Sequence, residues 1–216
     1  MPTLKRDDDV YVLDLGDGEN RFHPDWLTDM GAALDKVEQD PAPLVTTASG
    51  RFYSNGLDLD WLGEHGDALQ TYVASVQSLL ARVLAFPTPT VAALPGHTFA
   101  AGAMLAIAHD FRVMRADRGF FCYPEVDINI PFTPGMAALI QSKLTPATAH
   151  EAMTTGRRYG GTDAATVGLV DEAVAEDEVL PSALGRARAL AGKNPQILSA
   201  IKTQMYVGPL TALREG

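Results

Sequence analysis

Short apolar runs alternate with segments of helical periodicity along most of the chain. Four runs are typical of buried strands: Val10–Leu15, Leu44–Ala48, Val91–Leu94 and Val170–Val174. Apolar residues at helical spacing predict five helices: Pro24–Val37, Asp67–Phe86, Ala100–His109, Ala175–Ala191 and Gln196–Tyr206. Two Thr-Pro pairs, Thr133-Pro134 and Thr145-Pro146, each predict an N-cap followed by proline at the first helical position. This alternation favours an α/β fold with parallel strands.

The stretch from residue 90 to residue 135 carries the pattern with the clearest chemical meaning. After its strand and a Pro-Gly break, the predicted helix opens on small residues at Ala100, Ala101 and Gly102. Small residues let another backbone or a ligand approach closely. A buried helix also leaves its first N–H groups without internal partners at the positive end of its dipole, which suits a developing negative charge. Tight packing is the alternative interpretation.

Two further segments allow either a functional or a purely structural interpretation. Glu125 follows Pro124 in an apolar neighbourhood, where it is either a catalytic carboxylate or a solvated turn residue. Gly50–Leu59 contains an Asn-Gly turn signal, so it is either a plain tight turn or a loop that presents backbone N–H groups to a ligand. If the chain is extended after Glu125, Asp127 and Asn129 lie on the same side as that glutamate; otherwise they are solvated turn residues.

Composition and charge narrow the class of protein. The chain has 216 residues, of which 46% are hydrophobic, and this fits one domain with a small appended segment. The single cysteine, Cys122, excludes an intramolecular disulfide, and the charged N-terminus does not resemble a secretory signal, so we expect a cytoplasmic protein. The net charge of −10 argues against nucleic acid as a partner, and no apolar run is long enough to span a membrane.

Several common catalytic motifs are absent from the sequence. There is no Gly-x-Gly-x-x-Gly fingerprint, no P-loop and no Gly-x-Ser-x-Gly elbow. The five histidines are far apart in the sequence, so we expect no metal site.

Three segments follow one another in a specific order. They are Ser54–Leu59 (SNGLDL), Pro95–Thr98 (PGHT) leading through Ala100-Ala101-Gly102 to Asp110, and Pro124-Glu125-Val126 followed by Ile130-Pro131 and Pro134-Gly135. In this order they resemble the first oxyanion loop, the second oxyanion loop and the catalytic-glutamate segment of the crotonase family, the enoyl-CoA hydratase/isomerase superfamily. The similarity runs from Val10 to about Met205.

This resemblance implies a fold and an assembly. The fold is a spiral of ββα units that forms two roughly perpendicular sheets with helices around them. It implies a single core domain over residues 1–191 and a shortened C-terminal helical segment over residues 192–216. We expect a homo-oligomer such as a trimer, although the short C-terminus leaves open whether its helices make the contacts between subunits.

The resemblance also implies a site for an acyl-CoA substrate, with no metal or redox cofactor. By position, the backbone N–H groups of Leu57 and Ala101 hold the thioester oxygen, and Glu125 is the acid–base group. Five further residues are expected to bind the substrate: Ser54, Asn55, Gly56, Gly102 and Met104. Arg51 either meets a CoA phosphate or lies at the surface.

Met104 distinguishes between the reactions of the family. Hydratases carry a second glutamate at this helix position, whereas this chain keeps only Glu125. Moving a double bond needs one base, so we expect a Δ3,Δ2-enoyl-CoA isomerase that converts a 3-enoyl-CoA to the trans-2-enoyl-CoA through a dienolate, as in fatty acid β-oxidation. The alternatives are an enoyl-CoA hydratase or another thioester enzyme, and a non-catalytic acyl-CoA-binding protein.

Overall fold

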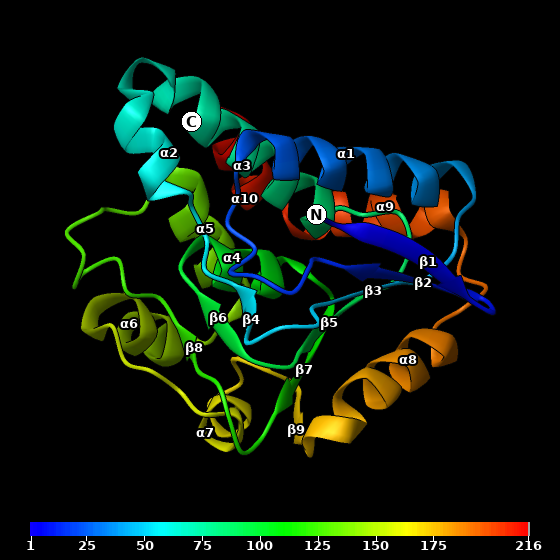
Figure 1. Cartoon of the computed structure of the whole chain (residues 1–216). Coiled ribbons are helices and arrows are strands. Elements are labelled where there is room, and N and C mark those ends of the chain that lie inside the picture. Colours follow the sequence, from blue (N-terminus) through cyan, green and yellow to red (C-terminus); the bar gives the residue numbers. More distant parts are fainter. Residues whose placement is uncertain (216) are drawn as a thin grey trace.

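The computed structural model describes residues 1–215 and contains two β-sheets with helices around them (Figure 1). Within these residues the larger sheet has the strand order β1-β2-β3-β5-β7-β9 and the smaller has the order β4-β6-β8. The larger sheet contains β1 (Thr3–Asp7), β2 (Val10–Asp14), β3 (Leu44–Thr47), β5 (Thr90–Leu94), β7 (Phe111–Arg115) and β9 (Glu172–Val174). The smaller contains β4 (Phe52–Ser54), β6 (His97–Phe99) and β8 (Phe121–Cys122). β1 pairs antiparallel with β2, and the other pairs are parallel.

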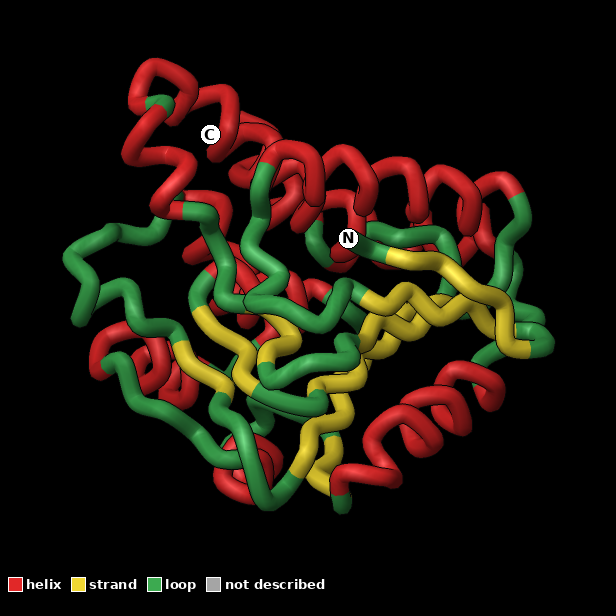
Figure 2. Tube along the Cα trace, in the orientation of Figure 1, coloured by secondary structure: helices red, strands yellow, loops and turns green. Residues whose placement is uncertain are grey.

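Helices surround the two sheets (Figure 2). They are α1 (Pro24–Gln39), α2 (Leu59–Glu64), α3 (Leu69–Leu84), α4 (Ala101–Ala108), α5 (Pro134–Lys143), α6 (Pro146–Thr155), α7 (Gly161–Thr166), α8 (Val179–Ala189), α9 (Pro195–Met205) and α10 (Val207–Glu215), with short 3-10 turns at Gly66–Ala68 and Glu176–Glu178. None of the helices in the described part of the chain has the length and apolar character needed to cross a membrane.

The chain winds as a spiral in which each turn contributes one strand to each sheet and then a helix. β3 and β4 are followed by α2 and α3, β5 and β6 by α4, and β7 and β8 by α5. The strands therefore stack in the same order in both sheets, with Val91 opposite Phe111 in the larger and Thr98 opposite Phe121 in the smaller. This arrangement confirms the predicted spiral of ββα units and the α/β class.

Alternation along β5 explains how the larger sheet holds helices on both faces. Val91 and Ala93 pack in a cluster with residues of α8, whereas Ala92 and Leu94 belong to the main core with residues of α1, α3 and α4. Successive side chains of a strand point to opposite faces, so one apolar strand serves two helix layers. Figure 1 shows α8 on one side of the sheet and α1 and α3 on the other.

Local signals predicted the helix starts well. Thr133 accepts a hydrogen bond from the Met136 N–H, and Thr145 accepts one from the Thr148 N–H, each with proline at the start of the helix. The edge strand β1 was not predicted, because its polar sequence, TLKRD, lacks the apolar positions of a buried strand. Charged residues are common on exposed edge strands because they hinder pairing with another chain.

The C-terminal helices α9 and α10 are attached to the rest of the chain in different ways, α10 by apolar packing and α9 by hydrogen bonds of a buried lysine. Leu210 and Leu213 of α10 are buried in the main hydrophobic cluster. On α9, the Lys202 ammonium donates to the carbonyl oxygens of Phe86 and Thr88 and lies 2.7 Å from an Asp110 carboxylate oxygen. The boundary between residues 191 and 192 stays a prediction, and one core includes residues from both sides of it.

Candidate active site

A cavity of about 450 Å³ lies between three segments of the chain. They are the first loop (Ser54–Leu59), the start of α4 with the loop before it (the second loop), and the segment that begins at Pro124-Glu125. Leu57, Ala101 and Glu125, which the sequence predicts as the catalytic groups, all line it. A larger and more open groove of about 930 Å³ lies between α1 and α3. Among residues 1–215, no acidic side chain lines that groove, so we place the candidate site in the smaller cavity.

The first loop leaves one backbone N–H free beside this cavity. The Gly56 N–H donates to the Ser54 hydroxyl at 3.1 Å, and the Asp58 N–H donates to the Tyr72 hydroxyl at 2.9 Å. Between them, the Leu57 N–H has no hydrogen-bond partner within residues 1–215. This donor is therefore available to a ligand in the cavity, which Leu57 lines.

The second free donor is at the start of α4. Ala101 is the first residue of that helix, and the first internal helical bond runs from the Met104 N–H to the Ala100 carbonyl at 3.0 Å. The Ala101 N–H has no partner among the described residues, as expected for the first turn of a helix. Because the positive end of the helix dipole lies here, negative charge on a nearby ligand oxygen is stabilised.

Close packing brings the two loops together. A Cβ atom added at Gly56, whose φ is +83°, would lie 2.8 Å from the Ala101 nitrogen. A Cβ added at Gly102 would lie 2.5 Å from the Ser54 carbonyl oxygen. Only glycine allows both approaches, so the two free N–H groups lie on loops in direct contact.

The five predicted substrate-binding residues separate into two groups. Asn55 and Met104 line the cavity. Ser54, Gly56 and Gly102 lie behind the lining, where they hold the loops together, and the Ser54 hydroxyl donates to the Asn20 carbonyl at 2.8 Å. A direct substrate contact for these residues stays a prediction.

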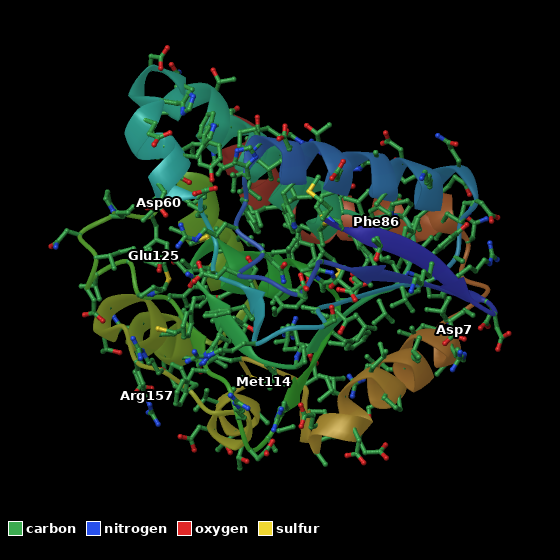
Figure 3. All side chains as sticks on the ribbon, viewed as in Figure 1. Asp7, Asp60, Phe86, Met114, Glu125 and Arg157 are labelled. Carbon is green, nitrogen blue, oxygen red and sulfur yellow. The ribbon has the colours of Figure 1, made fainter. Side chains whose placement is uncertain are left out.

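Glu125 is the buried acid–base candidate of the cavity. Its side chain is 6% exposed, and its Oε2 atom has no hydrogen-bond partner within residues 1–215. Burial raises the pKa of Glu125 to about 7, because the charged form loses its hydration. The other acidic residue that lines the cavity, Asp60, is exposed and pairs with Arg21. Figure 3 labels both carboxylates on the same side of the molecule.

The segment after Glu125 is a series of turns rather than an extended strand. The Ile130 N–H donates back to the Glu125 carbonyl at 3.1 Å, and Asn129 adopts a φ of +57°. Asp127 and Asn129 are exposed, so the alternation that would place them on the side of Glu125 does not apply. Their interpretation as turn residues is the correct one.

Three residues near the site were not found from the sequence. Arg21 and Arg158 line the cavity, and Tyr72 supports the first loop from α3. Their positions depend on tertiary packing, which no local pattern shows. Arg51 is exposed and does not line the cavity. The described residues contain no group of three or more potential metal ligands, and the absence of a metal cofactor stays a prediction.

Comparisons with known proteins show the family of the chain. A family model described as enoyl-CoA hydratase/isomerase matches residues 6–213. The chain is 35% identical to the peroxisomal enoyl-CoA delta isomerase 2 of Arabidopsis thaliana, over 95% of this chain and 92% of that protein.

Solved structures show the same fold. A probable enoyl-CoA hydratase from Mycobacterium tuberculosis superimposes with a TM-score of 0.93 at 28% identity, covering 100% of this chain and 92% of that chain. Human mitochondrial delta3-delta2-enoyl-CoA isomerase superimposes with a TM-score of 0.91 at 23% identity, covering 98% and 85%. The family model and the Arabidopsis relative together show that the chain belongs to the enoyl-CoA hydratase/isomerase family.

Proposed function

We propose that this protein is a Δ3,Δ2-enoyl-CoA isomerase that converts a 3-enoyl-CoA to the trans-2-enoyl-CoA. The proposal rests on the lining of the cavity: within residues 1–215 its single buried carboxylate is Glu125, and Met104 lines it at the helix position where the family resemblance places the second glutamate of a hydratase. A thioether cannot transfer protons, whereas moving a double bond requires only one group that accepts a proton and returns it.

The geometry supports the following reaction. The thioester oxygen accepts hydrogen bonds from the Leu57 and Ala101 N–H groups. The Glu125 carboxylate removes a proton from C2, and the electron pair of that C–H bond delocalises over the former 3,4 double bond and the carbonyl to give a dienolate. The protonated Glu125 then delivers its proton to C4, and the double bond forms between C2 and C3. No atom is gained or lost, so neither water nor a cofactor is consumed.

Two features of the cavity favour this chemistry. A carboxylate with a pKa of about 7 is a stronger base than one in water, and it is still ionised in part at neutral pH. Each preorganised donor to an oxyanion typically contributes about 10²–10³-fold in kcat. The Arabidopsis thaliana relative, which carries the name enoyl-CoA delta isomerase, supports the same reaction.

The proposal also covers location and assembly, which rest on separate observations. The lone cysteine favours a reducing compartment, and we propose the cytoplasm, although the Arabidopsis relative is named as peroxisomal. Three apolar side chains at helical spacing on α9, namely Ile197, Ile201 and Met205, are 60%, 51% and 65% exposed. An exposed apolar stripe of this kind supports a homo-oligomer, for which a trimer is our proposal.

Replacing Glu125 by Gln tests the assigned base. Because the amide keeps the shape but cannot accept the proton, kcat on a 3-enoyl-CoA should fall by about 10²–10⁴-fold, with the melting temperature maintained or raised. Asp60→Asn is the matched control, since it removes the exposed carboxylate of the same cavity and should change kcat only slightly. A folded Gln variant that turns over at nearly the wild-type rate would remove Glu125 from the mechanism.

A further inference from the structure

The loop that carries the Leu57 N–H is held from outside the cavity by a phenol. Tyr72 lies on α3, is 4% exposed and does not line the cavity. Its hydroxyl accepts a hydrogen bond from the Asp58 N–H at 2.9 Å. The ring packs beside Trp61 of α2, with 5.4 Å between ring centroids. The long helix α3 is thereby connected to the residue that follows the candidate oxyanion donor.

Two consecutive peptide groups at Leu57 are anchored in this way. The Gly56 carbonyl accepts a hydrogen bond from the Phe22 N–H at 2.8 Å. A carbonyl and the next N–H belong to one planar group and point in opposite directions, so this bond directs the Leu57 N–H away from Phe22. The next peptide group, from Leu57 to Asp58, is fixed by Tyr72. Together the two bonds restrain both backbone dihedrals of Leu57.

Of these two hydrogen bonds, only the one to Tyr72 can be removed by deleting a single side-chain atom, the phenol oxygen. Phe22 donates from its backbone, which substitution does not alter, whereas Tyr72 accepts through one side-chain oxygen. Without that oxygen the Asp58 N–H loses its partner, and the Leu57–Asp58 peptide group keeps only the hydrogen bond that its carbonyl accepts from the Leu59 N–H at 3.2 Å. The Leu57 N–H lies in the neighbouring peptide group, which is then held by the Phe22 bond alone, so a shift at the Leu57–Asp58 peptide changes how well that N–H is aligned with the oxygen that it must stabilise.

We infer that Tyr72 is a positioning residue for the isomerisation, because its hydroxyl holds the Leu57 N–H in the direction of the thioester oxygen. This inference rests on the proposed function, since it assigns Leu57 as an oxyanion donor. Its effect should appear in the chemical step more than in binding, because charge on that oxygen is largest in the dienolate.

Tyr72→Phe, compared with Tyr53→Phe, tests the inference. Tyr53 is a second buried tyrosine, whose hydroxyl hydrogen-bonds to the Thr46 hydroxyl at 2.8 Å and does not reach the first loop. Each variant loses one hydrogen bond of a buried tyrosine, partly buried at Tyr72 and fully buried at Tyr53, so the melting temperature should fall in both and at least as much in Tyr53→Phe. Only Tyr72→Phe should lower kcat on a 3-enoyl-CoA, by about tenfold or more and up to the 10²–10³-fold of a lost donor, with KM changed less than about threefold.

Hydrogen–deuterium exchange of the peptide covering residues 54–60 provides a readout that does not depend on turnover. Exchange there should be faster in Tyr72→Phe and unchanged in Tyr53→Phe. The inference is overturned if Tyr72→Phe keeps the wild-type kcat, if both variants lose kcat equally, or if loop exchange does not respond. A wild-type protein that turns over no 3-enoyl-CoA instead contradicts the proposed function, and loop exchange then decides alone whether Tyr72 holds the loop.

Discussion

Glu125 combines a buried position with a carboxylate oxygen that has no hydrogen-bond partner in the described part of the chain. Burial raises the pKa of Glu125 to about 7, so the basic form is depleted as the pH falls through that value. We therefore expect kcat/KM for isomerisation to rise with pH, about tenfold per unit below pH 7, and to level off above it. A pH–rate profile on a slow substrate measures this midpoint. A profile that is flat between pH 5 and 8 would show that burial does not control the base.

Ala100 has a residue-scale property that its sequence context does not reveal. Its φ is +50° and its ψ is −126°, a conformation that residues with a Cβ rarely adopt and that costs about 1–3 kcal/mol. Two backbone bonds hold it: its N–H donates to the Cys122 carbonyl, and its carbonyl accepts from the Met104 N–H, each at 3.0 Å. The backbone conformation of Ala100 turns the chain from β6 into α4, and Ala101, the first residue of that helix, lines the cavity.

At the scale of elements, the contact between the two loops is the feature that brings the two donors together. Replacing Gly56 by Ala would place a Cβ atom 2.8 Å from the Ala101 nitrogen, at a φ of +83°. We expect a loss of about 1–2 kcal/mol of stability from the backbone conformation alone, which lowers the melting temperature by a few degrees. Separation of the loops should also lower kcat by about tenfold or more.

Gly63→Ala on α2 is the control for this change. A Cβ added at Gly63 meets no heavy atom within 4 Å, so the substitution should be neutral or stabilise the helix by about 0.5–1 kcal/mol. Melting curves and isomerase rates for both variants complete the comparison. Equal activity of Gly56→Ala and wild type would mean that close contact between the loops is not required.

Elements with local signals were predictable from the sequence, and those determined by distant contacts were not. Thr133 and Thr145 cap their helices as predicted, because a cap depends on residues within one turn. The turns after Glu125 were left open, since alternation alone cannot show that the Ile130 N–H bonds back to the Glu125 carbonyl. In the sequence, Tyr72 is simply one residue of the predicted helix Asp67–Phe86. Its role becomes visible only in the structure, where α3 lies against the first loop and the Tyr72 hydroxyl accepts from the Asp58 N–H.

At the scale of the whole molecule, the spiral explains why three segments distant in sequence form one cavity. Each turn of the spiral ends one strand of the smaller sheet at the same edge, so the loops after β4, β6 and β8 lie beside one another (Figure 1). The fold and the cavity-lining groups Leu57, Ala101 and Glu125 were predictable because the order of the motifs carries this topology. The position of α10 was not predictable, because it depends on close packing between distant segments. A Cβ atom added at Gly135 of α5 would lie 2.7 Å from the Leu213 Cα atom of α10.

The most direct test of a single-base isomerase follows the near-ultraviolet absorbance of the conjugated enoyl thioester with the wild-type protein. Isomerisation of a 3-enoyl-CoA creates this conjugation, so absorbance rises, whereas hydration of a trans-2-enoyl-CoA removes it, so absorbance falls. With Glu125 as the only buried carboxylate that the described residues bring to the cavity, absorbance should rise on the 3-enoyl substrate, with hydration about 10²–10⁴-fold slower. Hydration as fast as isomerisation, or no rise with any chain length, would contradict the assignment.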